Sequence, residues 1–198
     1  MRNKFIFLAV ISLLIFIVFA AAIPRTTDID VFLLKGGMST RIPTATGFFK
    51  FITFFGTPAF FYPATAILSL IYYFWRQWRG FAAVIITMVA SWIIMEGLKL
   101  SFHRNRPALD PLQTASGYSF PSGHAMMGTV FFALLALWLI KKVPLPLRRV
   151  IPPVTVIFLF LLGYSRIYLG VHYPTDILAG YAAGTSIFAI FLAWWKEK

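Results

Sequence analysis

A histidine and an aspartate four residues apart, His172 and Asp176, form the pattern with the most chemical content in this chain. Pro174 stands between them, and proline favours the first turn of a helix, so we expect Asp176 to lie in that turn. A carboxylate there can accept the proton on one imidazole nitrogen and leave the other nitrogen free as a nucleophile. The chain contains no cysteine that could act as a nucleophile, and it contains three histidines. Because His172 has this carboxylate four residues away, it is the candidate nucleophile.

Three neighbouring residues, Ser122, Gly123 and His124, precede an apolar run and predict an anion site. Ser122 is placed to cap a helix whose free amide groups and positive dipole end favour an anion. Gly123 would let that anion approach the backbone closely. His124 would then be available as the general acid that protonates a departing alkoxide.

Three cations, Lys99, Arg106 and Arg166, complete this set of residues. Arginine forks match phosphate oxygens with paired hydrogen bonds, so the implied ligand is a phosphate. Together the residues predict phosphoryl transfer through a phosphohistidine, stabilised by fixed cations and amide groups. Asp176 is the one carboxylate expected at this centre, so we expect neither a metal ion nor a cofactor.

The elements that must position these residues are membrane spans. The 198 residues are 60% hydrophobic and 12% charged, with a mean hydropathy of +0.81. Because soluble domains contain about 25% charged residues, an ordinary soluble or disordered protein is excluded. Six uncharged runs approach the length of about 20 residues that a span needs, and we expect an all-α integral membrane bundle of six transmembrane helices. The runs cover residues 5–23, 58–75, 80–95, 125–140, 150–165 and 177–195.

The N-terminal part has two features of its own. The first run ends in three alanines, as signal peptides do, but its 19 residues exceed a signal core of about 7 to 15, so we expect a retained anchor. Residues 24–57 mix apolar and basic side chains and are interrupted by Gly36, Gly37 and Pro43. We expect one or two interfacial amphipathic segments there, with a partly ordered loop as the alternative. The lack of an internal repeat favours a single domain over residues 1–198.

A six-span topology brings the chemical residues together. The third and fifth spans end, and the fourth and sixth begin, at the same membrane face. Ionisable groups so close to hydrocarbon are costly and indicate a functional site. Every candidate residue lies at that face: Lys99, Arg106, Ser122, Gly123, His124, Arg166, His172 and Asp176.

The basic residues predict the orientation of the bundle. Ten lie on the face that holds both termini and eight on the other face. If a site holds Lys99, Arg106 and Arg166, the comparison becomes ten against five, and the positive-inside rule places both termini in the cytoplasm and the site at the outer face. Despite a net charge of +12, these residues form short clusters between apolar runs, so we expect no nucleic-acid partner. The ten are Arg2, Lys4, Arg76, Arg79, Lys141, Lys142, Arg148, Arg149, Lys196 and Lys198.

Several residues near the candidate site have simpler explanations. His103 and Arg104 are assigned surface positions or places beside the phosphate, outside the reacting group. Glu96 precedes Lys99 by three residues and can pair with it on one helix face. Small residues in the last run predict close helix packing within the bundle or, less commonly, a dimer contact. These are Ala179, Gly180, Ala183 and Gly184.

Three blocks of sequence, in this order, resemble the signature of the type 2 phosphatidic acid phosphatase superfamily: KLSFHRNRP at 99–107, PSGH at 121–124 and SRIYLGVHYPTD at 165–176. The resemblance covers a motif core at residues 99–183. It implies that His172 is the nucleophile, that Asp176 orients it and that His124 protonates the leaving group. It also implies a helical, metal-independent enzyme with its site near the outer membrane surface. The residues that it assigns to phosphate binding are Lys99, Arg106, Ser122, Gly123 and Arg166.

The expected function is a membrane-embedded phosphatase that removes phosphomonoester or pyrophosphate headgroups from lipids. The six-span format is similar to the phosphatidylglycerophosphatase B type, which favours conversion of phosphatidylglycerophosphate to phosphatidylglycerol. Undecaprenyl pyrophosphate is the close alternative, and phosphatidic acid is a further candidate. An anion transporter would need charged residues deep in several spans, and a non-catalytic lipid-binding relative would have lost His124, His172 or Asp176. The sequence shows neither feature, so we expect a lipid phosphate and membrane lipids as partners.

Overall fold

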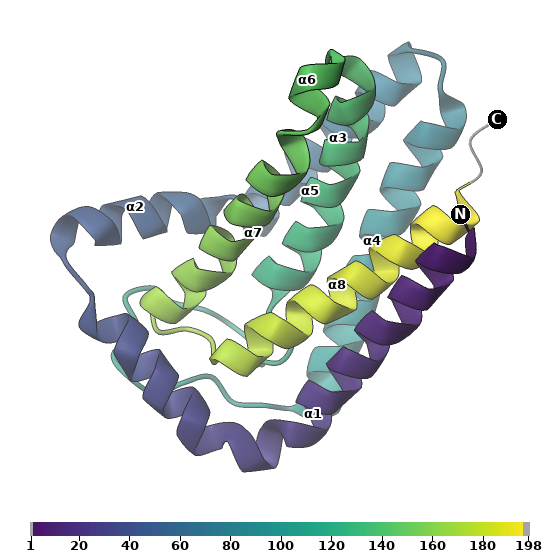
Figure 1. The fold of residues 1–198 in the computed structure, drawn as a ribbon. Coiled ribbons are helices and arrows are strands. Elements are labelled where there is room, and N and C mark those ends of the chain that lie inside the picture. Colours follow the sequence, from purple (N-terminus) through teal and green to yellow (C-terminus); the bar gives the residue numbers. More distant parts are fainter. Residues whose placement is uncertain (1, 196–198) are drawn as a thin grey trace.

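The computed structural model describes residues 2–195, and these residues form an all-helical bundle (Figure 1). Lys196 and Lys198, counted above among the basic residues, lie outside the described residues. Proline stands in the first turn of α2, α3, α7 and α8, where its missing amide proton costs nothing. The helices are α1 (Arg2–Ser39), α2 (Pro43–Phe54), α3 (Pro58–Phe74), α4 (Trp78–Phe102), α5 (Gly123–Lys142), α6 (Leu145–Arg148), α7 (Ile151–Tyr168) and α8 (Pro174–Trp194).

The predicted membrane bundle is confirmed. Within residues 2–195, five segments are long and apolar enough to cross a membrane, namely α1, α4, α5, the stretch from α6 through α7, and α8. A sixth arises when α2 and α3 count together as one span that is bent by 46°. The predicted second span, residues 58–75, corresponds to α3, which has 17 residues by itself. This segment therefore reaches the length of a membrane span only together with α2.

The first helix runs further than the sequence indicated. We expected the first span to end near residue 23, but α1 continues through Pro24 and ends at Ser39. Figure 1 shows that α1 changes direction along its course, as a proline inside a helix causes by removing one backbone hydrogen bond. The part after Pro24 lies across the end of the bundle and buries Asp30 and Leu34. The predicted interfacial region is thus helical and has two pieces, the part of α1 after Pro24 and α2. The first piece is continuous with the first span.

Small residues let the helices that carry the site approach one another closely. A Cβ atom added to Gly180 would lie 2.8 Å from the carbonyl oxygen of Ser122, and one added to Gly184 would lie 2.6 Å from that of Met126. Both contacts are shorter than a real Cβ tolerates, so α8 packs directly on the first turns of α5. The predicted small-residue face therefore serves packing within the bundle.

The loop between α4 and α5 is attached to the ends of α7 and α8. The amide of Leu112 donates to the carbonyl of Leu169 at 2.9 Å, and the amide of Ser122 donates to the carbonyl of Asp176 at 2.9 Å. This loop therefore closes one end of the bundle. At the same end lie the last turns of α4 and α7 and the first turns of α5 and α8.

Candidate active site

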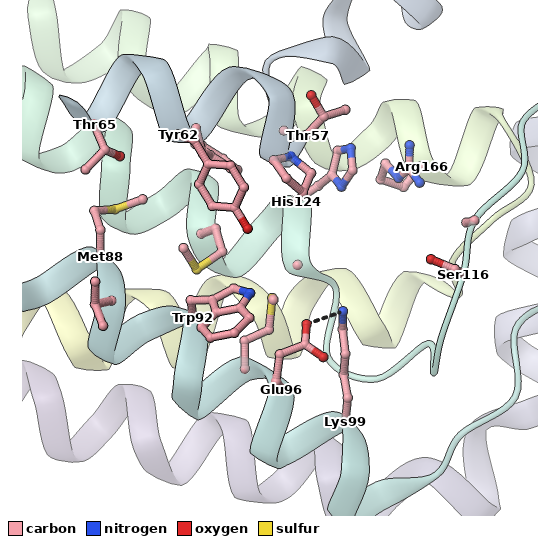
Figure 2. Close-up of a pocket in the computed structure, with 18 of the residues that line it drawn as sticks. Thr57, Tyr62, Thr65, Met88, Trp92, Glu96, Lys99, Ser116, His124 and Arg166 are labelled. Carbon is pink, nitrogen blue, oxygen red and sulfur yellow. Dashed lines mark hydrogen bonds and ion pairs between the residues drawn. The ribbon is translucent and has the colours of Figure 1, made fainter. Parts of the chain in front are cut away.

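A cavity of about 930 Å³ lies at the end of the bundle that the α4–α5 loop covers, and it extends between α3 and α4 (Figure 2). Six of the eight predicted site residues line it. Of the other two, Asp176 is buried and bonds to His172, and Ser122 is buried next to Gly123. The six lining residues are Lys99, Arg106, Gly123, His124, Arg166 and His172.

The hydrogen bonds of His172 determine which nitrogen carries its proton. Nε2 lies 3.0 Å from Nη1 of Arg106, and Nδ1 lies 3.3 Å from Oδ2 of Asp176. A guanidinium group has only donors, so Nε2 accepts and the proton is on Nδ1, facing the carboxylate. Burial lowers the pKa of His172 to about 4, and the hydrogen bond with Asp176 opposes this effect only in part. The imidazole is therefore neutral at pH 7 and presents an unprotonated Nε2 to the cavity.

The carboxylate of Asp176 is held on both oxygens. Oδ2 accepts hydrogen bonds from the amide of Tyr173 at 2.9 Å and from the hydroxyl of Ser119, in addition to its contact with His172. Oδ1 accepts from Nη1 of Arg104 at 2.7 Å. Pro174 is the first residue of α8, as predicted, and Asp176 lies in the first turn of that helix. Its position relative to His172 is consequently fixed by the start of α8 and by the α4–α5 loop.

His124 lies in the first turn of α5, with its ring against the end of α2. Nε2 is 3.1 Å from the carbonyl oxygen of Thr53, and because a carbonyl only accepts, Nε2 carries a proton and donates it. Gly56, in the turn between α2 and α3, makes room for the ring. A Cβ atom on that glycine would lie 2.2 Å from Cδ2 of His124. The bent α2–α3 pair therefore positions a residue of α5.

Two guanidinium groups face the cavity without a carboxylate partner among residues 2–195. Arg166, in the last turn of α7, donates from Nη1 to the hydroxyl of Thr53 at 2.5 Å and to Gln113 at 3.2 Å, while its buried Nε has no partner in the described structure. Arg106 donates to three backbone carbonyls besides His172, and burial lowers its pKa, an effect that Asp176 opposes. The site thus has uncompensated positive charge, which suits an anion.

Lys99 differs from the two arginines because it has a counterion. Its Nζ lies 3.3 Å from a carboxylate oxygen of Glu96, the pair that their spacing predicted (Figure 2). The side chain of Lys99 is 15% exposed and that of Glu96 is 43% exposed, and both line the cavity. A carboxylate therefore stands beside the cation cluster, on the side where the cavity continues between α3 and α4.

Ser122 and Gly123 only partly match their predicted roles. Ser122 is the N-cap residue of α5, but its side chain makes no capping hydrogen bond and its buried Oγ has no partner in the described structure. Ser122 therefore holds the predicted N-cap position, but without a capping hydrogen bond from its hydroxyl. Gly123 lines the cavity, where a Cβ atom would meet the sulfur of Met95 at 2.8 Å.

The structure adds residues that the sequence did not single out. Arg104, assigned a place outside the site, is buried and bonds to Asp176, and Asp30 of α1 bonds to Arg104 in turn. Ser119 and Thr53 contact the two candidate histidines. One available signal was electrostatic, because an aspartate within the largely apolar residues 29–34 needs a cation nearby.

Away from the cations, the cavity is lined mainly by apolar side chains of α3 and α4. Tyr62 and Thr65 lie on one side of it, and Met88 and Trp92 lie on the other (Figure 2). No group of three or more His, Cys, Asp or Glu side chains that could hold a metal ion occurs within the described part of the chain. The cavity therefore combines an anion site with an apolar extension.

Comparisons with known proteins show the family and the fold that this chain shares with other membrane proteins. The family model of the PAP2 superfamily matches residues 79–198. The chain is 29% identical over 184 residues to phosphatidylglycerophosphatase B of Bacillus subtilis (strain 168), covering 90% of each chain. It is 27% identical over 203 residues to an undecaprenyl-diphosphatase of Sulfolobus acidocaldarius, covering 94% of this chain and 89% of that one. The crystal structure of a transmembrane PAP2 type phosphatidylglycerolphosphate phosphatase from Bacillus subtilis matches with a TM-score of 0.88 at 29% identity, covering 94% of each chain.

Proposed function

The chain belongs to the PAP2 superfamily, and we propose that its cavity hydrolyses lipid phosphates through a phosphohistidine on His172. The observation that carries this proposal is the neutral imidazole with its unprotonated Nε2 beside uncompensated guanidinium groups. A neutral nitrogen with a lone pair is the form that attacks phosphorus. The adjacent cations bind the phosphate oxygens and stabilise the charge that they carry in the transition state.

In the first step, Nε2 of His172 attacks the phosphorus, a P–N bond forms and the bond from phosphorus to the lipid oxygen breaks. His124, in its protonated form, gives a proton to the departing alkoxide. Arg106 and Arg166 hold the phosphoryl oxygens, together with Lys99 and the backbone at Gly123 and Ser122. Asp176 accepts the hydrogen bond from Nδ1 and stabilises the positive charge that the ring acquires.

In the second step, water attacks the phosphorus, the P–N bond breaks and inorganic phosphate leaves. His124, now neutral, accepts the proton of that water. The donation from its Nε2 to the carbonyl of Thr53 holds the ring in one orientation for both steps. None of the steps requires a metal ion or a cofactor, and the residues that would carry them come from α4, α5, α7, α8 and the loops between them.

The favoured substrate is phosphatidylglycerophosphate. The apolar extension of the cavity suits a lipid chain, and the relative from Bacillus subtilis is named for this substrate. The carboxylate of Glu96 also favours a monophosphate, because the inner phosphate of a pyrophosphate would lie on the lipid side of the cation cluster and be repelled there. Undecaprenyl pyrophosphate remains the alternative, supported by the undecaprenyl-diphosphatase relative.

An anion transporter is the less favoured class. It would need charged groups along a path across the bundle. The buried aspartate, arginine and histidine residues of the described structure instead gather at one end of it: Asp30, Arg104, Arg166, His172 and Asp176.

This multi-pass membrane protein is proposed to have both termini in the cytoplasm and its cavity at the outer face. Exposed basic residues occur where α3 is connected to α4 and α5 to α6, at the end of the bundle opposite the cavity (Figure 1): Arg76, Arg79, Lys141 and Lys142. Basic loops favour the cytoplasmic side. The packing of α1 along α8 also supports a single domain over residues 1–198.

The test is phosphate release by purified protein in detergent with excess chelator. The substrates are phosphatidylglycerophosphate, phosphatidic acid and undecaprenyl pyrophosphate, and the variants are wild type and His172→Ala. We expect release by the wild type alone, fastest from phosphatidylglycerophosphate, with acid-labile phosphate trapped on the protein. Activity that survives in a correctly folded His172→Ala variant would overturn the mechanism.

A further inference from the structure

We propose that Asp30 and Arg104 are a positioning pair that holds Asp176 in place and preserves its charge during attack by His172. This inference rests on the proposed function of His172 as the nucleophile. Neither residue lines the cavity, and both act through the carboxylate behind the imidazole.

The contacts of Arg104 show how it restrains Asp176. Its guanidinium group bridges two carboxylates, with Nη1 at 2.7 Å from Oδ1 of Asp176 and Nη2 at 2.7 Å from Oδ2 of Asp30. It also donates to the hydroxyl of Thr175 at 2.8 Å and lies 4.3 Å from the centre of the Tyr173 ring. Because Arg104 occupies Oδ1, Asp176 cannot rotate without losing a charged hydrogen bond, and Oδ2 stays directed at His172.

Asp30 ties this arginine to the start of α8. It is 1% exposed, and its Oδ1 accepts from the amide of Thr175 at 3.0 Å while its Oδ2 accepts from the Thr175 hydroxyl at 2.6 Å. A carboxylate at the N-terminus of a helix is stabilised by the helix dipole. The part of α1 after Pro24 therefore docks on the helix turn that carries Asp176.

The charges in this group explain why both partners are needed. Asp30, Arg104 and Asp176 together carry one net negative charge. When Nε2 of His172 bonds to phosphorus, the ring becomes positively charged, and that net charge stabilises it. Without Asp30, the charge of Arg104 would cancel that of Asp176, and the stabilisation of the ring would be lost.

A purely structural role predicts a different outcome from a positioning role. Replacing one member of a buried ion pair leaves an uncompensated charge and strongly destabilises the fold, whereas replacing both with neutral residues is often tolerated. In the double variant Asp30→Asn with Arg104→Gln, asparagine keeps the size of Asp30, glutamine is shorter than Arg104, and both new side chains are neutral and can form hydrogen bonds. Asp176 alone then carries one net negative charge, as the group does in wild type, so the double variant tests the restraint on Oδ1 of Asp176 rather than the charge. If the pair only stabilises the fold, this double variant should recover activity as it recovers stability.

The experiment measures kcat, KM and the thermal unfolding midpoint for wild type, Asp30→Asn, Arg104→Gln and the double variant, with phosphatidylglycerophosphate in detergent. Asp28→Asn is the matched control, because it removes an exposed carboxylate from the same part of α1. We expect the double variant to unfold closer to wild type than Arg104→Gln does. We expect its kcat to fall at least about tenfold with KM within about twofold, since the cavity-lining residues are unchanged.

Asp30→Asn keeps the bond between Arg104 and Asp176, so it provides a second measurement if the double variant does not fold. We expect its kcat to fall about tenfold while Asp28→Asn keeps wild-type kcat. A wild-type kcat in the folded double variant, or equal kcat in Asp30→Asn and Asp28→Asn, overturns the positioning role. A wild type that forms no phosphohistidine overturns the proposed function instead, so the two failures are distinguishable.

Discussion

The substitution Gly56→Ala tests whether His124 is the general acid without altering any proposed catalytic side chain. A Cβ atom at this position would lie 2.2 Å from Cδ2, 2.6 Å from Cγ and 3.0 Å from Cβ of His124. Non-bonded carbon atoms prefer a separation of about 3.5 to 4.0 Å, so the ring or the α2–α3 turn must move by more than about 1 Å. The hydrogen bond from Nε2 to the carbonyl of Thr53, 3.1 Å long, is then lost.

The expected effect depends on the leaving group. General acid catalysis contributes about 10²- to 10⁴-fold when the leaving group is a basic alkoxide. We expect the rate of phosphohistidine formation from phosphatidylglycerophosphate to fall at least about 100-fold. With p-nitrophenyl phosphate, whose leaving group needs no proton, the burst of nitrophenolate should stay within about fivefold of wild type, since His172 and the arginines are unchanged. Rapid-mixing measurements of both bursts give the two rates.

Gly47→Ala is the matched control, because a Cβ atom on that glycine of α2 meets nothing within 4 Å. It should keep wild-type rates with both substrates. If Gly56→Ala slows both substrates equally, the substitution disturbs the phosphate site as a whole. If it slows neither, His124 is not the proton donor for the leaving group.

Further predictions concern selectivity, pH, metal dependence and packing. Glu96→Gln should increase kcat/KM for farnesyl diphosphate about tenfold relative to kcat/KM for farnesyl phosphate. The reason is that a negative charge within about 10 Å of the inner phosphate repels it by about 1.5 kcal/mol. An unchanged ratio of the two kcat/KM values contradicts this role. The pKa of His172 is about 4 in the fold and about 6.5 when unfolded. The unfolded chain therefore binds a proton more readily below pH 6.5, and the fold loses stability as the pH falls from 6.5 to 4, whereas above pH 6.5 this residue costs no stability. As the pH falls to 4, wild type should therefore lose about 3 kcal/mol relative to His172→Gln in thermal unfolding, and parallel pH curves would refute this. Excess chelator should leave wild-type phosphate release unchanged, whereas loss that added Mg²⁺ restores would contradict the mechanism. Gly184→Ala should lower the unfolding midpoint while Gly97→Ala, with open space around it, should not, and equal midpoints would refute the packing argument.

Much of the site followed from local rules. The spacing of His172 and Asp176 around Pro174 predicted a carboxylate in the first turn of a helix, and the structure has it there. The pairing of Glu96 with Lys99 followed from their positions on one helix face. Topology then placed four span ends at one membrane face, because consecutive spans alternate in direction. These features depend on short separations in the chain or on hydrophobic length alone.

Other features depended on contacts between residues far apart in the chain. Arg104 was assigned a surface position or a place beside the phosphate, because its partners, Asp30 and Asp176, are 74 and 72 residues away. The sequence did not indicate that the helix of the first span continues beyond Pro24 to Ser39, because packing of the later residues of α1 across the bundle maintains it. The contact between His124 and Thr53 depends on the bend between α2 and α3, which hydropathy does not encode.

The sequence by itself determined the membrane environment, the approximate spans and the kinds of group at the reacting centre, because hydrophobic length and side-chain chemistry are local properties. Only the tertiary structure decided the tautomer of His172, since that depends on Arg106 and Asp176 facing opposite nitrogens. It also decided which cations remain free for a phosphate. Glu96 neutralises Lys99 and two carboxylates surround Arg104, so Arg106 and Arg166 are the guanidinium groups lining this cavity that have no acidic partner among residues 2–195. The sequence specifies which residues are charged. Whether a counterion compensates a given charge depends on the distance between the two groups, and the packed fold sets that distance.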